Sequence, residues 1–246
     1  ALVTLCSLLL GWISWEQERR RQEQTTVAWV IEMGGRKDFR YLVGVGWWKR
    51  NWVLTTDKFF GELLREIWFN ETNVTDLSPL AGLKNLEVLG LDKTKVSDLS
   101  LVAGIENIKF LSLNQTQVSD LSPLAGLSNL EWLYLGETEV SDLSPLAGLK
   151  NLEEIWLNDT QVSDLSPLAK LGSLRELWLD GIKVSDLSPL AGMENLERLY
   201  FHKTEVSDLS PLANMKNLKR LGFSKTEVSD LSPLAGMENL EELYLD

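Results

Sequence analysis

The stretch VSDLSPLAGMENLERL, residues 184–199, decides the architecture, because close copies of it fill most of the chain. A fixed period of 20 to 50 residues is the signature of a stacked-repeat protein. A single unit leaves its apolar face wet, so the units fold only as a stack that shares one core. The valine that opens each copy recurs every 22 residues, at Val74, Val96, Val118, Val140, Val162, Val184, Val206 and Val228.

Within one unit the apolar residues follow the spacing L-x-x-L-x-L-x-x-T-x-V, as in residues 86–96. The alternation in Leu89-Gly90-Leu91 predicts a short strand whose leucines face the core while the residue between them faces outward. This frame and its DLSPLAGLxNL tail resemble the leucine-rich repeats of the bacterial internalin type. The resemblance implies an α/β solenoid, a right-handed coil with a parallel β-sheet on its concave face and turns or short 3-10 or α segments on the convex side.

The residues that recur after each strand are predicted to be scaffold. Asp98 and its equivalents can accept backbone N–H bonds at the start of the return turn, and Pro123 and its equivalents suit a first helical position. A recurring aspartate could also suggest calcium, but each coil supplies only one, beside Ser and Leu, so capping is favoured over metal binding. The glycines expected to adopt a left-handed cap are Gly82, Gly104, Gly126, Gly148, Gly192 and Gly236.

The N-terminal quarter has a different composition. Residues 1–15, ALVTLCSLLLGWISW, are predominantly apolar and shorter than the roughly 20 residues that span a bilayer. They start at Ala rather than Met, so we expect an N-terminally truncated transmembrane anchor. A cleaved signal peptide is the alternative, but no small-x-small cleavage site precedes the arginines that follow.

Three further segments complete the predicted organisation. Residues 16–35 carry strong helix formers that end at a Gly-Gly pair and predict a charged N-terminal helix, a stalk. Residues 36–63 are rich in Trp and Phe and are expected to cap the first hydrophobic layer of the repeats. Residues 64–246 form the repeats and stop within a strand, so a C-terminal truncation is expected. An anchor, a stalk and a cap before such repeats resemble membrane-anchored leucine-rich repeat proteins of environmental bacteria. That implies a single-pass protein, whose repeat domain lies on an unknown side of the membrane.

Function in such a fold depends on the outward positions of the strands, because the inward positions are needed for packing. Aromatic rings at consecutive outward positions would form a continuous ladder, with glutamates and arginines beside it. A contiguous apolar patch of this kind marks an interaction surface more often than isolated rings do. The predicted partner-binding residues are Phe110, Trp132, Tyr134, Glu154, Trp156, Glu176, Trp178, Arg198, Tyr200 and Arg220. The competing interpretation is that the rings only stack on one another and stiffen the sheet.

Other function classes have little support in the sequence. His202 is the only histidine, and neither a phosphate-binding loop nor a base beside a nucleophile is present, so no catalytic residue, metal site or cofactor is predicted. A net charge of −12 would repel nucleic acid over most of the surface. One cysteine excludes a disulfide within the chain.

The favoured function is therefore a membrane-tethered module that recognises a protein or peptide on its concave face. Tyr and Trp supply large contact areas, while charged neighbours set orientation. Two alternatives remain: a carbohydrate binder whose sugar rings stack on Trp156 and Trp178, and a structural scaffold whose effector domain is missing. The sequence leaves the oligomeric state open.

Overall fold

The computed structural model describes residues 65–245 of the chain. The predicted anchor, stalk and N-terminal cap, residues 1–63, lie outside the described residues. Within residues 65–245 no helix combines the length and the apolar character needed to cross a membrane.

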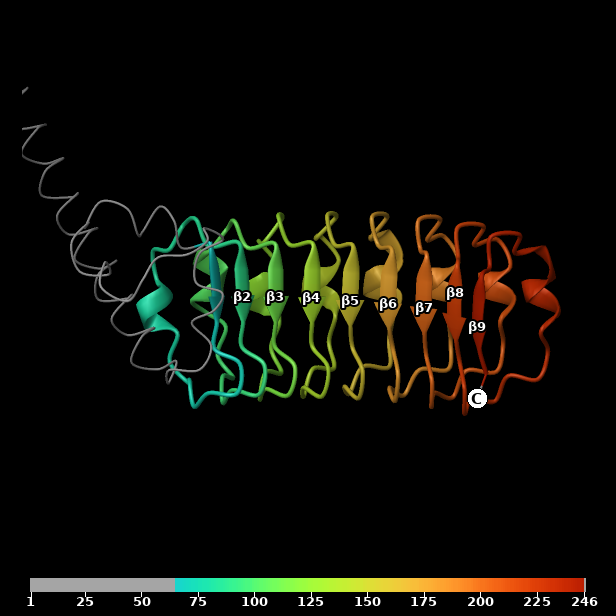
Figure 1. Cartoon of the computed structure of the whole chain (residues 1–246), viewed down its shortest axis with the longest axis horizontal. Coiled ribbons are helices and arrows are strands. Elements are labelled where there is room, and N and C mark those ends of the chain that lie inside the picture. The colour runs from blue at the N-terminus through green and yellow to red at the C-terminus, as the bar shows by residue number, and fades with distance from the viewer. Residues whose placement is uncertain (1–64, 246) are drawn as a thin grey trace, which may run out of the picture.

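Nine short strands follow one another in chain order and form one parallel sheet (Figure 1). Each strand pairs with the next at an offset of 22 residues, so that Leu111 lies beside Leu133 and Leu133 beside Ile155. This confirms the predicted solenoid of one strand per coil. The strands are β1 (Glu66–Trp68), β2 (Val88–Gly90), β3 (Phe110–Ser112), β4 (Trp132–Tyr134), β5 (Glu154–Trp156), β6 (Glu176–Trp178), β7 (Arg198–Tyr200), β8 (Arg220–Gly222) and β9 (Glu242–Tyr244).

Backbone bonds between coils continue beyond these three-residue strands. The Leu135 N–H donates to the Trp156 carbonyl at 2.8 Å, and the Glu137 N–H donates to the Asn158 carbonyl at 2.7 Å. At the other end of the strand, the Glu131 N–H donates to the Lys109 carbonyl at 2.8 Å. Because both flanks of each strand are held in this way, the spacing of the outward side chains is set by the backbone.

The return side of each coil contains a short 3-10 helix. The Asp120 carboxylate accepts the Ser122 backbone N–H at 2.8 Å, and the Ser122 hydroxyl and N–H together lower the pKa of Asp120. The equivalent aspartate makes the same backbone bond in all eight coils, and proline occupies the first turn in seven, which confirms the capping prediction. The helices are η2 (Ser78–Leu80), η3 (Val102–Gly104), η4 (Ser122–Leu124), η5 (Ser144–Leu146), η6 (Ser166–Lys170), η7 (Ser188–Leu190), η8 (Ser210–Leu212) and η9 (Ser232–Gly236).

The prediction of left-handed glycine caps was wrong for five of the six glycines. Of these six, Gly82 alone has a positive φ, of 92°. The left-handed residue of each coil instead follows the strand, where the chain turns sharply away from the sheet. Gly181 takes this position in one coil, and elsewhere side-chain-bearing residues do: Glu71, Lys93, Gln115, Glu137, Asp159, Lys203 and Lys225.

The core is a stack of similar apolar layers on the inward side of the sheet. Leu133 at the centre of β4 is fully buried, as are Ile155 and Leu177 at the same position of the next strands. The polar groups in these layers are satisfied locally, since the Thr94 hydroxyl donates to the Leu91 carbonyl at 2.7 Å and most coils repeat this bond. Burial of this kind explains why the inward positions are nearly invariant along the chain.

Candidate functional site

The outward face of the sheet carries two columns of variable side chains, one at each end of the strands. The strand register places Trp132 beside Glu154 in the first column and Tyr134 beside Trp156 in the second. We call the second one the ring column. All ten predicted site residues lie in these two columns: Trp132, Glu154, Glu176, Arg198 and Arg220 in the first together with Phe110, and Tyr134, Trp156, Trp178 and Tyr200 in the ring column.

The aromatic side chains form an unbroken series of ring contacts. Tyr134 stacks on Trp156 with centroids 4.2 Å apart and planes inclined by 16°, while Trp178 lies 4.1 Å from Tyr200. Trp156 and Trp178 are 5.3 Å apart, and Phe110 meets Tyr134 edge-on at 5.0 Å. The stacking that the stiffening interpretation requires is therefore present.

Two glycines extend the series at its ends. A Cβ on Gly90 would overlap the Trp68 ring, and one on Gly222 would lie 2.8 Å from the Tyr200 ring. Because neither residue has a side chain, Trp68 reaches Phe110 across β2 at 5.4 Å and Tyr200 reaches Tyr244 across β8 at 6.2 Å. An aromatic ring of the preceding coil, Trp68 or Tyr200, thus fills the space above each glycine.

Burial differs along the columns. Trp132, Tyr134, Trp156 and Trp178 are half-buried and keep part of each ring in contact with solvent. Tyr200, which was also predicted to contact a partner, is only 8% exposed and is therefore much less accessible than these four rings. Trp178 on one side and Tyr244 on the other cover its ring. The burial of Tyr200 therefore results from packing between coils.

Glu154 is the central polar group of this face. The Tyr134 hydroxyl donates to its carboxylate at 2.9 Å. Burial, the largest influence, raises the pKa of Glu154, and the Tyr134 hydroxyl only partly offsets it. The buried Trp156 indole N–H has no acceptor in hydrogen-bond geometry, although it lies close enough to Glu154 to lower that pKa slightly.

The predicted arginines are not free. Arg198 forms an ion pair with Glu176, whose other carboxylate oxygen accepts the Trp178 indole N–H at 2.7 Å. Arg220 pairs with Glu242 at 3.1 Å. The two predicted arginines, on β7 and β8, are thus neutralised by neighbouring carboxylates on the same face.

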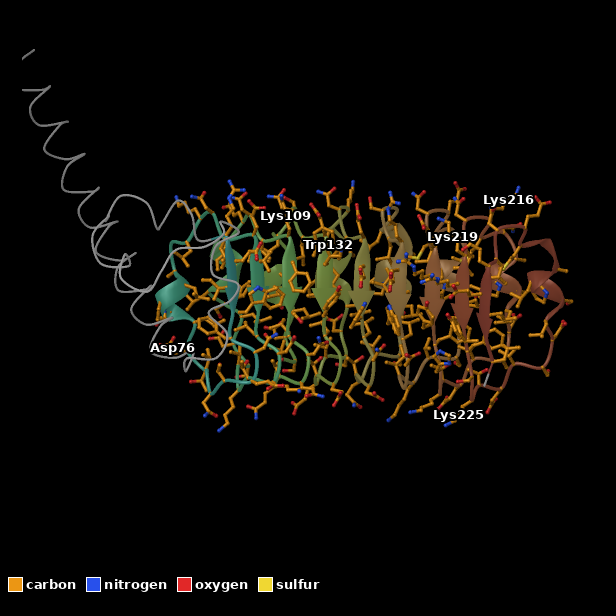
Figure 2. All side chains as sticks on the ribbon, in the orientation of Figure 1. Asp76, Lys109, Trp132, Lys216, Lys219 and Lys225 are labelled. Atoms are coloured by element: carbon orange, nitrogen blue, oxygen red, sulfur yellow. The ribbon has the colours of Figure 1, made fainter. Side chains whose placement is uncertain are left out.

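A third column precedes the strands and alternates in charge. Glu87 pairs with Arg65 at 2.7 Å and with Lys109 at 3.1 Å, and Glu197 pairs with Lys219 at 2.7 Å. In Figure 2 Lys109, Lys219 and Trp132 all lie in the upper half of the solenoid, and Lys225 lies at its lower edge. The alternation fails where Glu131 and Glu153 follow each other.

Sequence reasoning missed a ladder of side chains directly after the strands. The Asn114 side-chain oxygen accepts the Gly136 N–H at 2.8 Å, and Asp180 accepts the His202 N–H at 2.8 Å. His202 continues the ladder, since its Nδ1 accepts the Ser224 backbone N–H at 2.9 Å. In several coils Asn or Asp recurs two residues after the outward residue of the strand. That pattern was too irregular to predict the ladder, because other coils have Gly, His or Ser at the same position.

Metal-ligand geometry is lacking in the part of the chain that the structure describes, where no cluster of three His, Cys, Asp or Glu side chains converges on a possible ion site. The one-per-coil aspartates are engaged by serine instead, as at Asp120 and Ser122. What the outward face can do chemically is to bind: it offers ring edges, an indole N–H and a carboxylate on a backbone of fixed spacing.

The chain is similar to known repeat proteins. A family described as Leucine Rich repeats (2 copies) matches residues 128–170. The solved structure of internalin C2 from Listeria monocytogenes has a TM-score of 0.72 and 34% identity, over 74% of this chain and 80% of that one. Internalin F from the same organism has a TM-score of 0.63 and 31% identity, over 70% of this chain and 58% of that one. No curated protein matches.

A more distant structure shares the fold alone. The plant peptide hormone receptor RGFR1, solved in complex with RGF2, has a TM-score of 0.64 and 19% identity. The match covers 76% of this chain and 32% of the receptor.

Proposed function

The chain belongs to the internalin-like leucine-rich repeat proteins of bacteria, and we propose that it is a recognition module that binds a protein or peptide across the first column and the ring column. Leucine-rich repeat proteins are typically binding scaffolds rather than enzymes, which agrees with the chemistry available on this face. The fold accommodates peptide ligands, since the plant receptor that shares it is solved with one.

One observation carries the proposal: the half-buried rings of Tyr134, Trp156 and Trp178 are contiguous, with the half-buried Trp132 in the adjoining column, on a face that β-strand spacing holds rigid. Each ring would lose its remaining contact with water under a partner, and large aromatic side chains dominate binding energy in such positions. A rigid surface also keeps low the entropic cost of ordering on binding.

The ring geometry favours a polypeptide over a sugar. Tyr134 covers one face of Trp156, and Tyr200 covers one face of Trp178. The two indoles then lie 5.3 Å from each other. Since neighbouring rings occupy the faces of Trp156 and Trp178, sugar rings have little flat surface to stack on at these two residues, whereas side chains of a peptide can pack along the ring edges.

We further propose that residues 1–15 tether this module to a membrane. Support comes from the sequence, in which an apolar run with Trp12 and Trp15 is followed at once by a charged segment. Alkaline carbonate washing of membranes that carry the expressed full chain tests this. Retention in the pellet is expected, and release into the supernatant contradicts tethering.

The binding function is tested by selecting a random library of displayed peptides on the immobilised full chain, with a glycan array probed in parallel. Two variants define the site. Trp132→Ala removes a ring without disturbing ring stacking, and Trp156→Ala with Trp178→Ala removes the centre of the ring column. Peptides that bind the native chain are expected to lose at least about 30-fold in affinity on either variant, the effect of truncating a central aromatic residue.

The outcomes separate the possible functions. Selected peptides that bind the Trp132→Ala variant and the double variant as well as the native chain would contradict the proposed face. Glycan binding without peptide binding would favour the carbohydrate alternative. The Trp132→Ala variant keeps the test decisive if the double variant fails to fold, which circular dichroism reports.

A further inference from the structure

Glu154 stands out because it has no cationic partner. Among residues 65–245 no lysine or arginine nitrogen lies within ion-pair distance of its carboxylate. In the same range the Tyr134 hydroxyl makes the one hydrogen bond of normal geometry to this carboxylate, with the Trp156 indole N–H nearby. A carboxylate accepts several such bonds, so most of its capacity is unused on a half-buried surface.

Most neighbouring charges are negative as well, and Arg198, a cation that partly lowers the pKa of Glu154, is already paired with Glu176. Glu131 has no ion pair in the described part of the chain, and Glu153 has only Arg175, at 3.9 Å. Glu176 lies beside Glu154 in the strand register, and its charge raises the pKa of Glu154. Glu131, Glu153 and Glu154 thus leave an excess of negative charge at the start of β4 and β5, and like charges on adjacent strands are destabilising.

The same columns elsewhere pair their charges internally. Arg198 neutralises Glu176, Arg220 neutralises Glu242, and Lys219 neutralises Glu197. Glu176, Glu242 and Glu197 are therefore each paired with a basic residue of an adjacent coil. At β4 and β5 tryptophan and glutamate occupy those places, and no basic residue of β3 to β6 compensates for Glu154.

An aromatic ring with an uncovered surface lies beside this carboxylate. Trp132 is the register partner of Glu154 in the first column. Among the four tryptophans of residues 65–245 it alone makes no ring contact with another aromatic side chain of that range. A planar guanidinium can stack on an indole while it donates hydrogen bonds to a carboxylate, whereas a lysine ammonium can only do the second well.

We propose that Glu154 and Trp132 form a subsite for a cationic side chain of the bound polypeptide, with arginine preferred. The inference rests on the proposed function and names the chemistry of its partner. The guanidinium stacks on Trp132 and donates to the Glu154 carboxylate, and its charge offsets the excess negative charge of Glu131, Glu153 and Glu154. The acidic net charge of −12 favours approach of a basic segment from solution.

The experiment uses peptides selected on the full chain, each synthesised with arginine or with citrulline, its neutral isostere. Affinities are measured by calorimetry on the native chain and on Glu154→Gln. The matched control is Glu66→Gln, which removes the same charge from the same column four strands away, about 19 Å. That separation exceeds the Debye length of about 8 Å at physiological salt, so the control isolates local pairing.

Citrulline should weaken binding to the native chain at least about tenfold, the effect of breaking a close interfacial charge pair. On Glu154→Gln the difference between the two peptides should shrink to about twofold, while on Glu66→Gln it should stay unchanged. Selected peptides without basic residues, or with equal arginine and citrulline affinities, would overturn the cationic subsite and leave the proposed binding face standing. Failure to select any peptide that depends on Trp132 or Trp156 would overturn both.

Discussion

The two sides of a single strand behave differently, as β4 shows. Leu133 points inward and is fully buried, while Trp132 and Tyr134 on either side of it point outward and are half-buried. The inward residue is surrounded by layers above, below and across the core, so only a narrow range of shapes fits. The outward residues meet neighbours along the stack alone, which leaves them free to carry a binding surface.

The outward face is itself divided. Around β7 and β8 the arginines are paired with Glu176 and Glu242, and Tyr200 is buried among other rings. Around β4 and β5 the carboxylate of Glu154 lacks a cation and Trp132 lacks an aromatic neighbour among the described residues. Satisfied groups contribute to the fold, whereas unsatisfied groups remain available for a partner.

Truncating an inward residue should give the largest loss of stability. Leu177→Ala should lower the free energy of unfolding by about 2 to 5 kcal/mol, because the truncated side chain leaves a cavity in a packed layer. Urea titration followed by circular dichroism measures this. Trp132→Ala is the outward counterpart and should cost less than half as much. Equal losses would show that the outward face supports folding as strongly as the core does.

The ring column tests whether outward residues also support the fold. The sequence alone predicts that the double change Trp156→Ala and Trp178→Ala barely moves the melting temperature. The structure revises this, because the change removes three ring contacts of roughly 0.5 to 1.5 kcal/mol each. We expect a loss of about 1.5 to 4 kcal/mol in a urea titration, together with the loss of peptide binding. Intact binding by the folded variant would leave stiffening as the only role of the rings.

The ladder of side chains directly after the strands should contribute less to stability than the ring column does. His202→Ala removes the acceptor for the Ser224 backbone N–H and should cost about 1 kcal/mol, the usual net value of such a bond. His202→Asn should cost less, because asparagine makes the equivalent bond at Asn114. Thermal melts of both variants at neutral pH compare them. Equal destabilisation by the two changes would argue against the ladder.

Neutralising Glu154 should change the stability least, and it should raise the stability rather than lower it. Its pKa is raised in the folded chain, so ionisation favours the unfolded state. The protonated form is stabilising below the unfolded pKa, near about 4.3, and that contribution is lost as the pH rises through the raised folded value. Glu154→Gln resembles the protonated form and should therefore melt slightly higher than the native chain at pH 7.

The pH dependence provides the control for this prediction. The difference in melting temperature between Glu154→Gln and the native chain should vanish as the pH falls below the ordinary pKa of glutamate, where both side chains are neutral. Glu66→Gln, at the far end of the same column, is the matched comparison. A native chain that melts higher than Glu154→Gln at pH 7 would mean that the carboxylate stabilises the fold.

Short-range sequence patterns predicted the repeat architecture of this protein correctly. The 22-residue period, the parallel register and the outward direction of Trp156 between Ile155 and Leu157 all follow from an alternation that a one-residue slip would invert. The capping aspartates follow from a short-range hydrogen bond within the turn. The positions of the left-handed residues were missed, because the sharp bend leaving each strand is mostly occupied by residues such as Glu, Lys and Gln rather than by glycine.

The sequence by itself therefore determined which residues share the outward face, since strand periodicity and repeat length depend only on neighbours along the chain. Only the tertiary structure decided which of them are available. Residues 22 apart meet through rotamers that the sequence does not specify, so Tyr200 became buried and Arg198 became paired with Glu176. Within residues 65–245 the same packing left Glu154 without a cation and Trp132 without an aromatic neighbour, because the adjoining coils place tryptophan and glutamate where a basic side chain would have closed the pair.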